Sequence, residues 1–366
     1  MAARTKPPFR ADHVGSLLRP KHLLRAREDH AAGKLSASEL RAIEDEAIRA
    51  AVKMQEEIGL QGVTDGEFRR TDWVVDFKYQ LGGVSKLDNV IKVPFESEHG
   101  KIDWQFVEYR VEKLHLDRCI FGEDFGFLKS VARATPKITL PSPSMMHYPG
   151  GRGIDRHVYP DMEEFFDDLA KVYAKEIDML GKLGCTYLQL DDTSLAFLND
   201  PKRRAMLGEG AEKQHLRYIE LFNAAIAGKP AGMSICTHLC RGNYRSAWMA
   251  AGGYEHVADA LFNGLNVDGF FLEYDDERSG GFEPLRFVPK GKMVVLGLVT
   301  TKRPALESKD VLKRRIEEAS KFVSLDQICL SPQCGFASTS EGNELTLDDQ
   351  IAKLRLVVET AREVWG

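Results

Sequence analysis

Short apolar or β-branched runs alternate with longer helical patterns along the whole chain, and this alternation limits the possible folds more than any other feature. Several of the runs are continuously apolar, which is typical of parallel strands buried on both faces. The runs that we predict to be strands are Phe9–Val14, Gly62–Asp65, Lys137–Leu140, Thr186–Leu190, Gly232–Thr237, Gly269–Glu273, Met293–Val299 and Gln327–Ser331. Eight alternating β/α units predict an α/β fold, specifically a (β/α)8 TIM barrel.

Helical patterns fill the segments between these runs. They cover Ala37–Ile58, Met162–Leu183, Lys213–Ala227, Asp310–Phe322 and Leu347–Val364, and we expect the last of these helices to close the outer ring. The length of 366 residues fits one large barrel with insertions, so we predict a single catalytic domain over residues 1–366.

One connection is too long for a simple link between a strand and a helix. Between Asp65 and Lys137 the segments Tyr79–Val93 and Asp103–Leu116 alternate like the strands of a hairpin. We therefore predict that residues 66–136 form an insertion between strands two and three that folds over the barrel mouth.

Charge and composition exclude several classes of partner. The formal net charge of −5 gives no support for binding to nucleic acid or to an acidic membrane surface. No apolar run approaches the roughly 20 residues of a membrane helix, and the N-terminus lacks the apolar core of a signal peptide. We therefore expect a cytoplasmic protein, in which the 6 cysteines are reduced thiols or metal ligands.

Four potential metal ligands follow predicted strands. His238 and Cys240 come after the fifth run, Glu273 ends the sixth, and Cys334 comes after the eighth. Functional side chains of such barrels lie at the carboxyl ends of the strands, so these four should meet on one face. One imidazole, two thiolates and one carboxylate suit Zn²⁺, with a hydrogen-bond acceptor orienting the second ring nitrogen of His238.

The ligand set also indicates the chemistry. Two thiolates and one carboxylate make the site electron-rich, which favours a nucleophilic bound thiolate over activated water. A structural zinc site or a chance group of core residues would be the alternatives, although the cysteines spaced closely before Cys240 and Cys334, namely Cys236 and Cys329, fall within apolar runs. The remaining cysteines of the apolar runs, Cys185, Cys236 and Cys329, are expected to be core residues.

The chain resembles the cobalamin-independent methionine synthase family, in a single-barrel form similar to the C-terminal catalytic domain. The family's zinc pattern, H-x-C followed by E and then C-G, is matched by His238-Leu239-Cys240, Glu273 and Cys334-Gly335. This resemblance spans nearly the whole chain. It implies Zn²⁺ as the cofactor and homocysteine as the thiol substrate.

Three more segments fit the family's homocysteine site. The turn Val14-Gly15-Ser16 matches the one that binds the substrate backbone, and Glu67 and Asp191 match the carboxylates that hold its amino group. Two carboxylates also suit an ammonium group without any reference to the family. The alternatives are a surface acid for Glu67 and helix caps for Asp191 and Ser16.

The methyl-donor side matches less well. Val299 stands where the family has a histidine that donates a proton, and Lys302 could place a charge nearby. Arg118 resembles part of the family's folate element. Tyr148 could stack on a ring and His147 could replace the missing acid, while loop packing is the alternative for both.

Together these residues predict a zinc-dependent methyltransferase that converts homocysteine to methionine, similar to 5-methyltetrahydropteroyltriglutamate–homocysteine S-methyltransferase. The donor would be 5-methyltetrahydrofolate, as its polyglutamate, or another methyl carrier such as a corrinoid. The alternatives are a related zinc-dependent alkyltransferase for another thiol and electrophile, a metal-free porphyrinogen decarboxylase and a zinc-stabilised protein without enzymatic activity.

Overall fold

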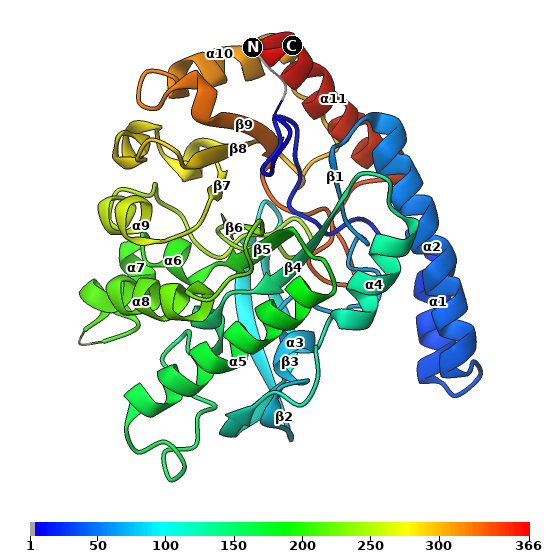
Figure 1. Ribbon diagram of the computed structural model, residues 1–366, viewed down its shortest axis with the longest axis vertical. Coiled ribbons are helices and arrows are strands. Elements are labelled where there is room, and N and C mark those ends of the chain that lie inside the picture. The colour runs from blue at the N-terminus through cyan, green and yellow to red at the C-terminus, as the bar shows by residue number, and fades with distance from the viewer. Residues whose placement is uncertain (1–3, 209) are drawn as a thin grey trace.

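A curled parallel β-sheet forms the centre of the protein in the computed structural model, which describes residues 4–208 and 210–366 (Figure 1). Its 7 strands follow the order β1-β4-β5-β6-β7-β8-β9. Their bounds are Gly62–Val63 for β1, Thr135–Pro141 for β4, Tyr187–Asp192 for β5, Ser234–Leu239 for β6, Gly269–Glu273 for β7, Met293–Val299 for β8 and Ile328–Pro332 for β9. These strands overlap the predicted runs from the second to the eighth, which confirms an α/β fold built on a parallel sheet.

The first predicted strand, Phe9–Val14, is wrong as a strand. Only Ala11 makes a bridge, an isolated parallel one to Leu330 of β9. The side chain of Asp12 accepts a hydrogen bond of 3.0 Å from the backbone nitrogen of Phe9, and this local turn competes with a regular ladder. The segment therefore runs beside β9 without extending the 7-stranded ladder.

Helices cover the outside of the sheet (Figure 1). The α-helices are α1 Lys21–Ala31, α2 Ala37–Ile58, α3 Val75–Lys78, α4 Gly122–Val131, α5 Met162–Lys182, α6 Ser194–Phe197, α7 Pro201–Ala205, α8 Gln214–Ile226, α9 Ala258–Gly264, α10 Lys309–Ala319 and α11 Leu347–Trp365. The 3-10 helices are η1 Pro143–Met146, η2 Ala211–Lys213, η3 Glu277–Ser279, η4 Glu283–Phe287 and η5 Leu325–Gln327. Within the described part of the chain, no helix is long and apolar enough to cross a bilayer.

Capping explains why two of the long helices begin where they do. Ser36 accepts a hydrogen bond from the backbone nitrogen of Glu39, and the Glu39 side chain bonds back to Ser36. Thr346 and Asp349 form the same reciprocal pair at the start of α11. Such capping boxes satisfy backbone groups that a helix end leaves free, and losing the capping residue costs about 1 kcal/mol.

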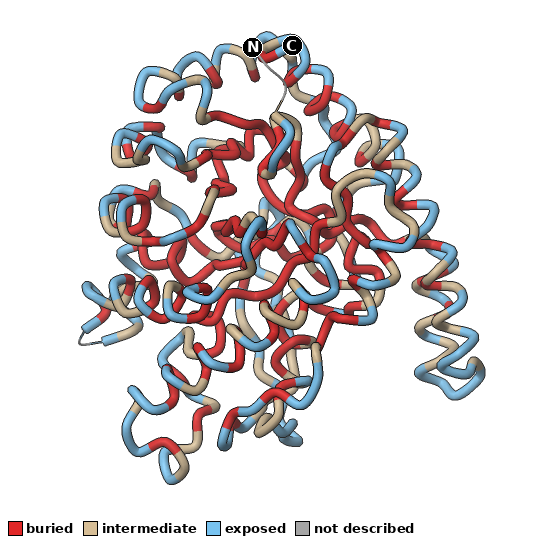
Figure 2. Tube along the Cα trace, in the orientation of Figure 1, coloured by how far each residue is buried: buried red, intermediate tan, exposed pale blue. Residues whose placement is uncertain are grey.

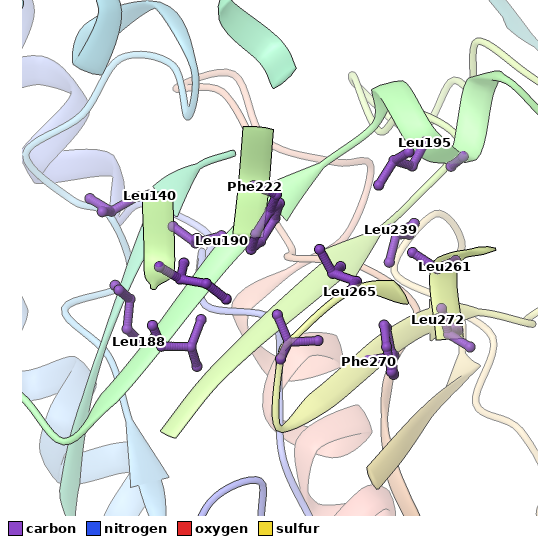
Figure 3. Packing of buried hydrophobic residues seen from close by; sticks show 14 of the residues in the cluster. Leu140, Leu188, Leu190, Leu195, Phe222, Leu239, Leu261, Leu265, Phe270 and Leu272 are labelled. Carbon is purple, nitrogen blue, oxygen red and sulfur yellow. The ribbon is translucent and has the colours of Figure 1, made fainter. Parts of the chain in front are cut away.

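The main core lies between the sheet and the helices. Figure 2 shows the strands as a continuous buried centre, whereas the helices alternate buried and exposed residues. Leu188 and Leu190 of β5 and Phe270 and Leu272 of β7 belong to one apolar cluster with residues of α5, α8 and α9 (Figure 3). Burying each such side chain contributes about 1.5–3 kcal/mol, so the continuously apolar strands fix the sheet inside its helices.

An antiparallel hairpin occupies the long connection between β1 and β4. Its strands are β2, Gly82–Ser97, and β3, Gly100–His115, and they form a separate 2-stranded sheet. Isolated bridges join Glu96 to Trp248 and Val111 to Ile154. The hairpin is thereby attached to loops that follow β6 and β4.

Candidate metal centre

Parallel register places the candidate ligands at one end of the sheet. His238 lies in β6 and pairs with Asp191 of β5. Cys240 follows β6 directly, Glu273 is the last residue of β7, and Cys334 follows the end of β9 by two residues. All of them lie at the carboxyl ends of parallel strands, where the loops of such sheets build ligand sites.

Three of the four predicted ligands form a compact buried group. One ligand atom from each of His238, Cys240 and Cys334 lies within 4.8 Å of the other two, and all three residues are buried. In the described residues, neither ring nitrogen of His238 has a hydrogen-bond partner. A buried polar atom without a partner is costly, so an imidazole in this state beside two thiols fits a tetrahedral Zn²⁺ ion.

The acceptor that we expect beside the second nitrogen of His238 is therefore not found in the part of the chain that the structure describes. The ionisation of the thiol pair, Cys240 and Cys334, nevertheless favours metal binding. A hydrogen bond from Cys240 holds the pKa of Cys334 well below its ordinary value, with help from nearby His238 and Lys302 and against the effect of burial. A thiolate is the form of cysteine that binds metal.

Glu273 stands beside this group without joining it. Its Oε2 accepts a hydrogen bond of 2.7 Å from the backbone nitrogen of Arg241, and its Oε1 lies 3.2 Å from Nζ of Lys302. Burial raises the pKa of Glu273, but Lys302, Arg241 and Arg278 together lower it to about 2. The carboxylate is ionised and already has protein partners.

A pocket of about 480 Å³ opens onto the group formed by His238, Cys240 and Cys334. Its wall includes His238, Cys240 and Cys334 together with residues of the predicted substrate site, namely Val14, Ser16, Glu67 and Asp191. Gly15, between Val14 and Ser16, has a φ of +146°, and a Cβ there would sit 2.8 Å from Cγ2 of Thr139. The turn therefore requires glycine at this position.

Two buried carboxyl groups face the pocket. Oε1 of Glu67 accepts a hydrogen bond of 2.9 Å from Thr139, whereas Oε2 has no hydrogen-bond partner among the described residues. Burial raises the pKa of Glu67, and it raises that of Asp191 to about 7. A cationic group in the pocket would satisfy Glu67 Oε2 and favour ionisation of both acids.

The positions of Glu67, Asp191 and Ser16 argue against the structural alternatives considered for them. Glu67 is 3% exposed, so it is not a surface acid. Asp191 lies within β5, and it is the neighbouring Asp192 that accepts a hydrogen bond from the backbone nitrogen of Leu195. Pro20, not Ser16, precedes α1. None of the three predicted substrate residues caps a helix or lies on the open surface.

The predicted donor residues are divided between two regions. His147 and Tyr148 line the pocket, and Nδ1 of His147 lies 2.9 Å from the hydroxyl of Tyr218. Burial, with a contribution from Arg156, lowers the pKa of His147 to about 4. Val299 is fully buried in the core.

Arg118 and Lys302 are absent from the pocket wall formed by the described residues. Arg118 is exposed and donates a hydrogen bond of 2.8 Å to Gln80. Lys302 is buried and lies between Glu273 and Asp275, at 3.2 and 3.7 Å from their oxygens. The structure therefore places Lys302 beside Glu273, next to the group formed by His238, Cys240 and Cys334.

An aromatic wall is the feature that the sequence analysis missed. Trp73, Trp104, Phe106 and Tyr109 line the pocket, and the last three belong to β3 of the hairpin. The ring centroids of Trp104 and Phe106 lie 4.8 Å apart. Nε1 of Trp104 donates a hydrogen bond of 3.0 Å to Asp72, which fixes this wall against the loop after β1. The alternation of Trp104 and Phe106 in a predicted hairpin strand is a signal that could have found it.

Comparison with known proteins gives consistent similarities. The family model described as the catalytic domain of cobalamin-independent synthase matches residues 9–98 and 157–363. The uncharacterised Bacillus subtilis protein YxjH is 48% identical over 98% of this chain and 96% of its own length. A methionine synthase from Pyrococcus abyssi is 25% identical over 94% of this chain and 88% of its own.

A solved structure from Listeria monocytogenes, described as a candidate vitamin-B12-independent methionine synthase, superposes with a TM-score of 0.79 at 39% identity. The match covers 99% of this chain and 100% of that one. The family model includes all of the predicted metal ligands but omits residues 99–156, which contain β3 and the loop of His147 and Tyr148.

Proposed function

Because the chain belongs to the cobalamin-independent methionine synthase family, we propose that it transfers a methyl group to the thiol of homocysteine and forms methionine. The activity is that of a 5-methyltetrahydropteroyltriglutamate–homocysteine S-methyltransferase. The observation that carries this proposal is the position of the buried group His238, Cys240 and Cys334 at the base of a pocket that also presents two buried carboxyl groups.

We assign Zn²⁺ to His238, Cys240 and Cys334, with Glu273 as an exchangeable fourth ligand. When bound there, zinc supplies a Lewis acid that keeps a substrate thiol ionised at neutral pH. The protein's part is to hold the ligands in place. The low pKa of Cys334 and the unpaired His238 ring support this assignment.

The amino group of homocysteine is assigned to Glu67 and Asp191, and its backbone atoms to the turn Val14-Gly15-Ser16. The free Oε2 of Glu67 and the raised pKa of Asp191 both favour a cation between these groups. Binding the amino group at the pocket wall would direct the thiol toward His238 and Cys240. Such orientation lowers the barrier by making attack on the methyl carbon effectively intramolecular.

The methyl donor is assigned to the part of the pocket with aromatic residues, where a planar ring can stack on Trp104 of the aromatic wall or on Tyr148. In the transfer, the thiolate sulfur forms a bond to the methyl carbon. The bond from that carbon to the donor breaks, and its electron pair stays on the donor. With 5-methyltetrahydrofolate the leaving nitrogen also needs a proton, for which His147 is the candidate.

A corrinoid methyl carrier is the second candidate donor, and one observation favours it. A His147 pKa of about 4 leaves the ring almost entirely neutral at pH 7, so it rarely carries the proton that a general acid must donate. A methyl–cobalt bond breaks without protonation of the leaving atom. The two donors therefore differ in their need for His147.

The test is methionine formation by the zinc-loaded protein with homocysteine, using 5-methyltetrahydrofolate and methylcobalamin in parallel. Turnover with either donor supports the synthase assignment, and loss of turnover in His147→Gln with folate alone would support His147 as the acid. Stoichiometric zinc without methionine from either donor would contradict the proposal and favour an alkyltransferase for another thiol. Zinc that proves necessary only for folding would favour a structural role.

We also propose that Phe9–Val14, although not a regular strand, takes the place of the first strand and closes the 7-stranded sheet into a barrel of the (β/α)8 type, and that residues 66–136 act as an insertion over its mouth within one domain. The bridge from Ala11 to Leu330 and the hairpin residues of the pocket wall support this. Replacing residues 84–113 by a short Gly-Ser linker should preserve cooperative unfolding and zinc binding while weakening donor binding. Loss of the fold would contradict the insertion.

A further inference from the structure

The carboxylate of Glu273 has a full set of protein partners. Its side chain is 0% exposed, its Oε2 accepts a hydrogen bond from the Arg241 backbone at 2.7 Å, and its Oε1 lies 3.2 Å from Nζ of Lys302. The guanidinium groups of Arg241 and Arg278 lie at 4.0 and 3.7 Å. The negative charge of Glu273 is therefore compensated by the protein.

Lys302 contacts a second buried carboxylate besides Glu273. Its side chain is 6% exposed, and its Nζ also lies 3.7 Å from Asp275, whose side chain is 1% exposed. A buried ammonium group is tolerated only when carboxylates surround it, since an unpaired charge in the interior is strongly unfavourable. Lys302 thus shares its charge between Asp275 and the one predicted metal ligand that stands outside the compact group.

We propose that Lys302 is a positioning residue that competes with the bound metal for Glu273, so that this carboxylate would remain easy for the substrate thiol to displace. The inference rests on the proposed function, because it takes zinc to bind at this group. It adds a residue that the ligand pattern does not include and gives Lys302 a role different from that of a donor-side charge.

Competition between Lys302 and the metal for the same carboxylate has a measurable consequence. Without the lysine, Glu273 can turn to the metal and complete a four-ligand site. The metal should then bind more tightly, and an incoming thiol should displace the carboxylate less readily. An ordinary supporting residue acts in the opposite direction, since removing a partner of a metal ligand usually weakens metal binding by about 10–100-fold.

The test measures the zinc affinity of Lys302→Met by competition with a chromophoric chelator under reducing conditions. We expect an affinity about tenfold higher than that of the wild-type protein, the inverse of the usual loss. In the cobalt-substituted variant, the homocysteine concentration needed to change the visible absorption spectrum should rise by a similar factor. Both readouts are independent of turnover.

Two further variants test the competition for Glu273, and the second of them separates it from a general structural role of Lys302. Asp275→Asn removes the second partner of Lys302, which leaves the lysine to pair with Glu273 alone, so zinc should bind more weakly than in the wild type. In a Glu273→Gln background, Lys302→Met should no longer tighten zinc binding. Thermal unfolding of the metal-free proteins reports whether each variant is folded. If Lys302→Met does not fold, the zinc affinity of Asp275→Asn tests the inference instead.

Unchanged or weaker zinc binding by folded Lys302→Met would overturn the inference. It would also be overturned if Lys302→Met raised the zinc affinity equally in the Glu273→Gln background. Unchanged or tighter zinc binding by Asp275→Asn would overturn it independently. A wild-type protein that binds no zinc would instead refute the proposed function, so the two failures are distinguishable.

Discussion

Replacing Asp191 by asparagine should stabilise the folded protein and weaken the binding of substrate. Asp191 is buried, and burial raises its pKa from 3.8 to about 7. The folded protein therefore holds this proton more tightly than the unfolded chain does. The resulting stability is fully present below the unfolded pKa and is lost as the pH rises through about 7.

The size of the effect follows from the shift. Each pKa unit corresponds to about 1.4 kcal/mol, so the ionised group costs up to about 4 kcal/mol at high pH. Asparagine cannot ionise, and its carbonyl oxygen can still accept the hydrogen bond that Asp191 receives from Gln189. Burying the amide of asparagine offsets part of the gain, so we expect the metal-free variant to be about 2 kcal/mol more stable at pH 8.

Substrate binding should change in the opposite direction. A hydrogen bond between charged groups contributes about 1.5–3 kcal/mol, so the KM for homocysteine should rise by about 10–100-fold in Asp191→Asn. The assays are urea unfolding of the metal-free protein at pH 8 and pH 5 and methionine formation by the zinc-loaded protein. The gain in stability should be larger at pH 8.

Asp192→Asn is the matched control. The Asp192 carboxylate is also buried, but it accepts hydrogen bonds from Ser142, Ser144, Ser194 and the backbone of Leu195. This variant should therefore lose stability at both pH values. A destabilised Asp191→Asn at pH 8, or one with an unchanged KM, would refute our account of the amino-group site.

Three more variants test other parts of the site. Cys334→Ser should abolish zinc binding in a chelator assay and methionine formation with it, while far-UV circular dichroism stays unchanged; unfolding would indicate structural zinc. Gly15→Ala places a Cβ 2.8 Å from Thr139 at a φ of +146°, so we expect the KM for homocysteine to rise about tenfold or more with zinc binding intact. Trp104→Ala removes a stacking surface, so the KM of the methyl donor should rise about 2–10-fold while that of homocysteine does not, and equal changes in both would argue against a donor site at the hairpin.

The sheet could be predicted from the sequence because parallel strands buried on both faces are apolar throughout. Val294 to Leu296 of β8 have no exposed surface, and runs of this kind identify strands without further information. Phe9–Val14 differs, because Arg10, Asp12 and His13 interrupt its apolar residues, and it forms only one bridge. The Asp12 side chain accepts a hydrogen bond from the backbone nitrogen of Phe9, and this local turn replaces a regular ladder.

The metal group could be predicted because strand ends are fixed by the sheet. His238 lies in β6 and Cys334 follows β9, and the register of these strands leaves little freedom, so their meeting follows from the topology. Lys302 and Arg118 lie in connecting segments, where the position of a residue in the sequence does not determine the direction of its side chain. Lys302 turns toward Glu273, and Arg118 lies on the surface beside Gln80. Long-range packing of loops decides such positions.

The most direct test of the central claim is zinc X-ray absorption on the zinc-loaded protein before and after homocysteine is added. We predict a first shell with nitrogen from His238 and sulfur from Cys240 and Cys334, which gains one further sulfur scatterer when the thiol binds. A shell that stays unchanged at saturating homocysteine would contradict the account, because the substrate sulfur would then not reach the metal.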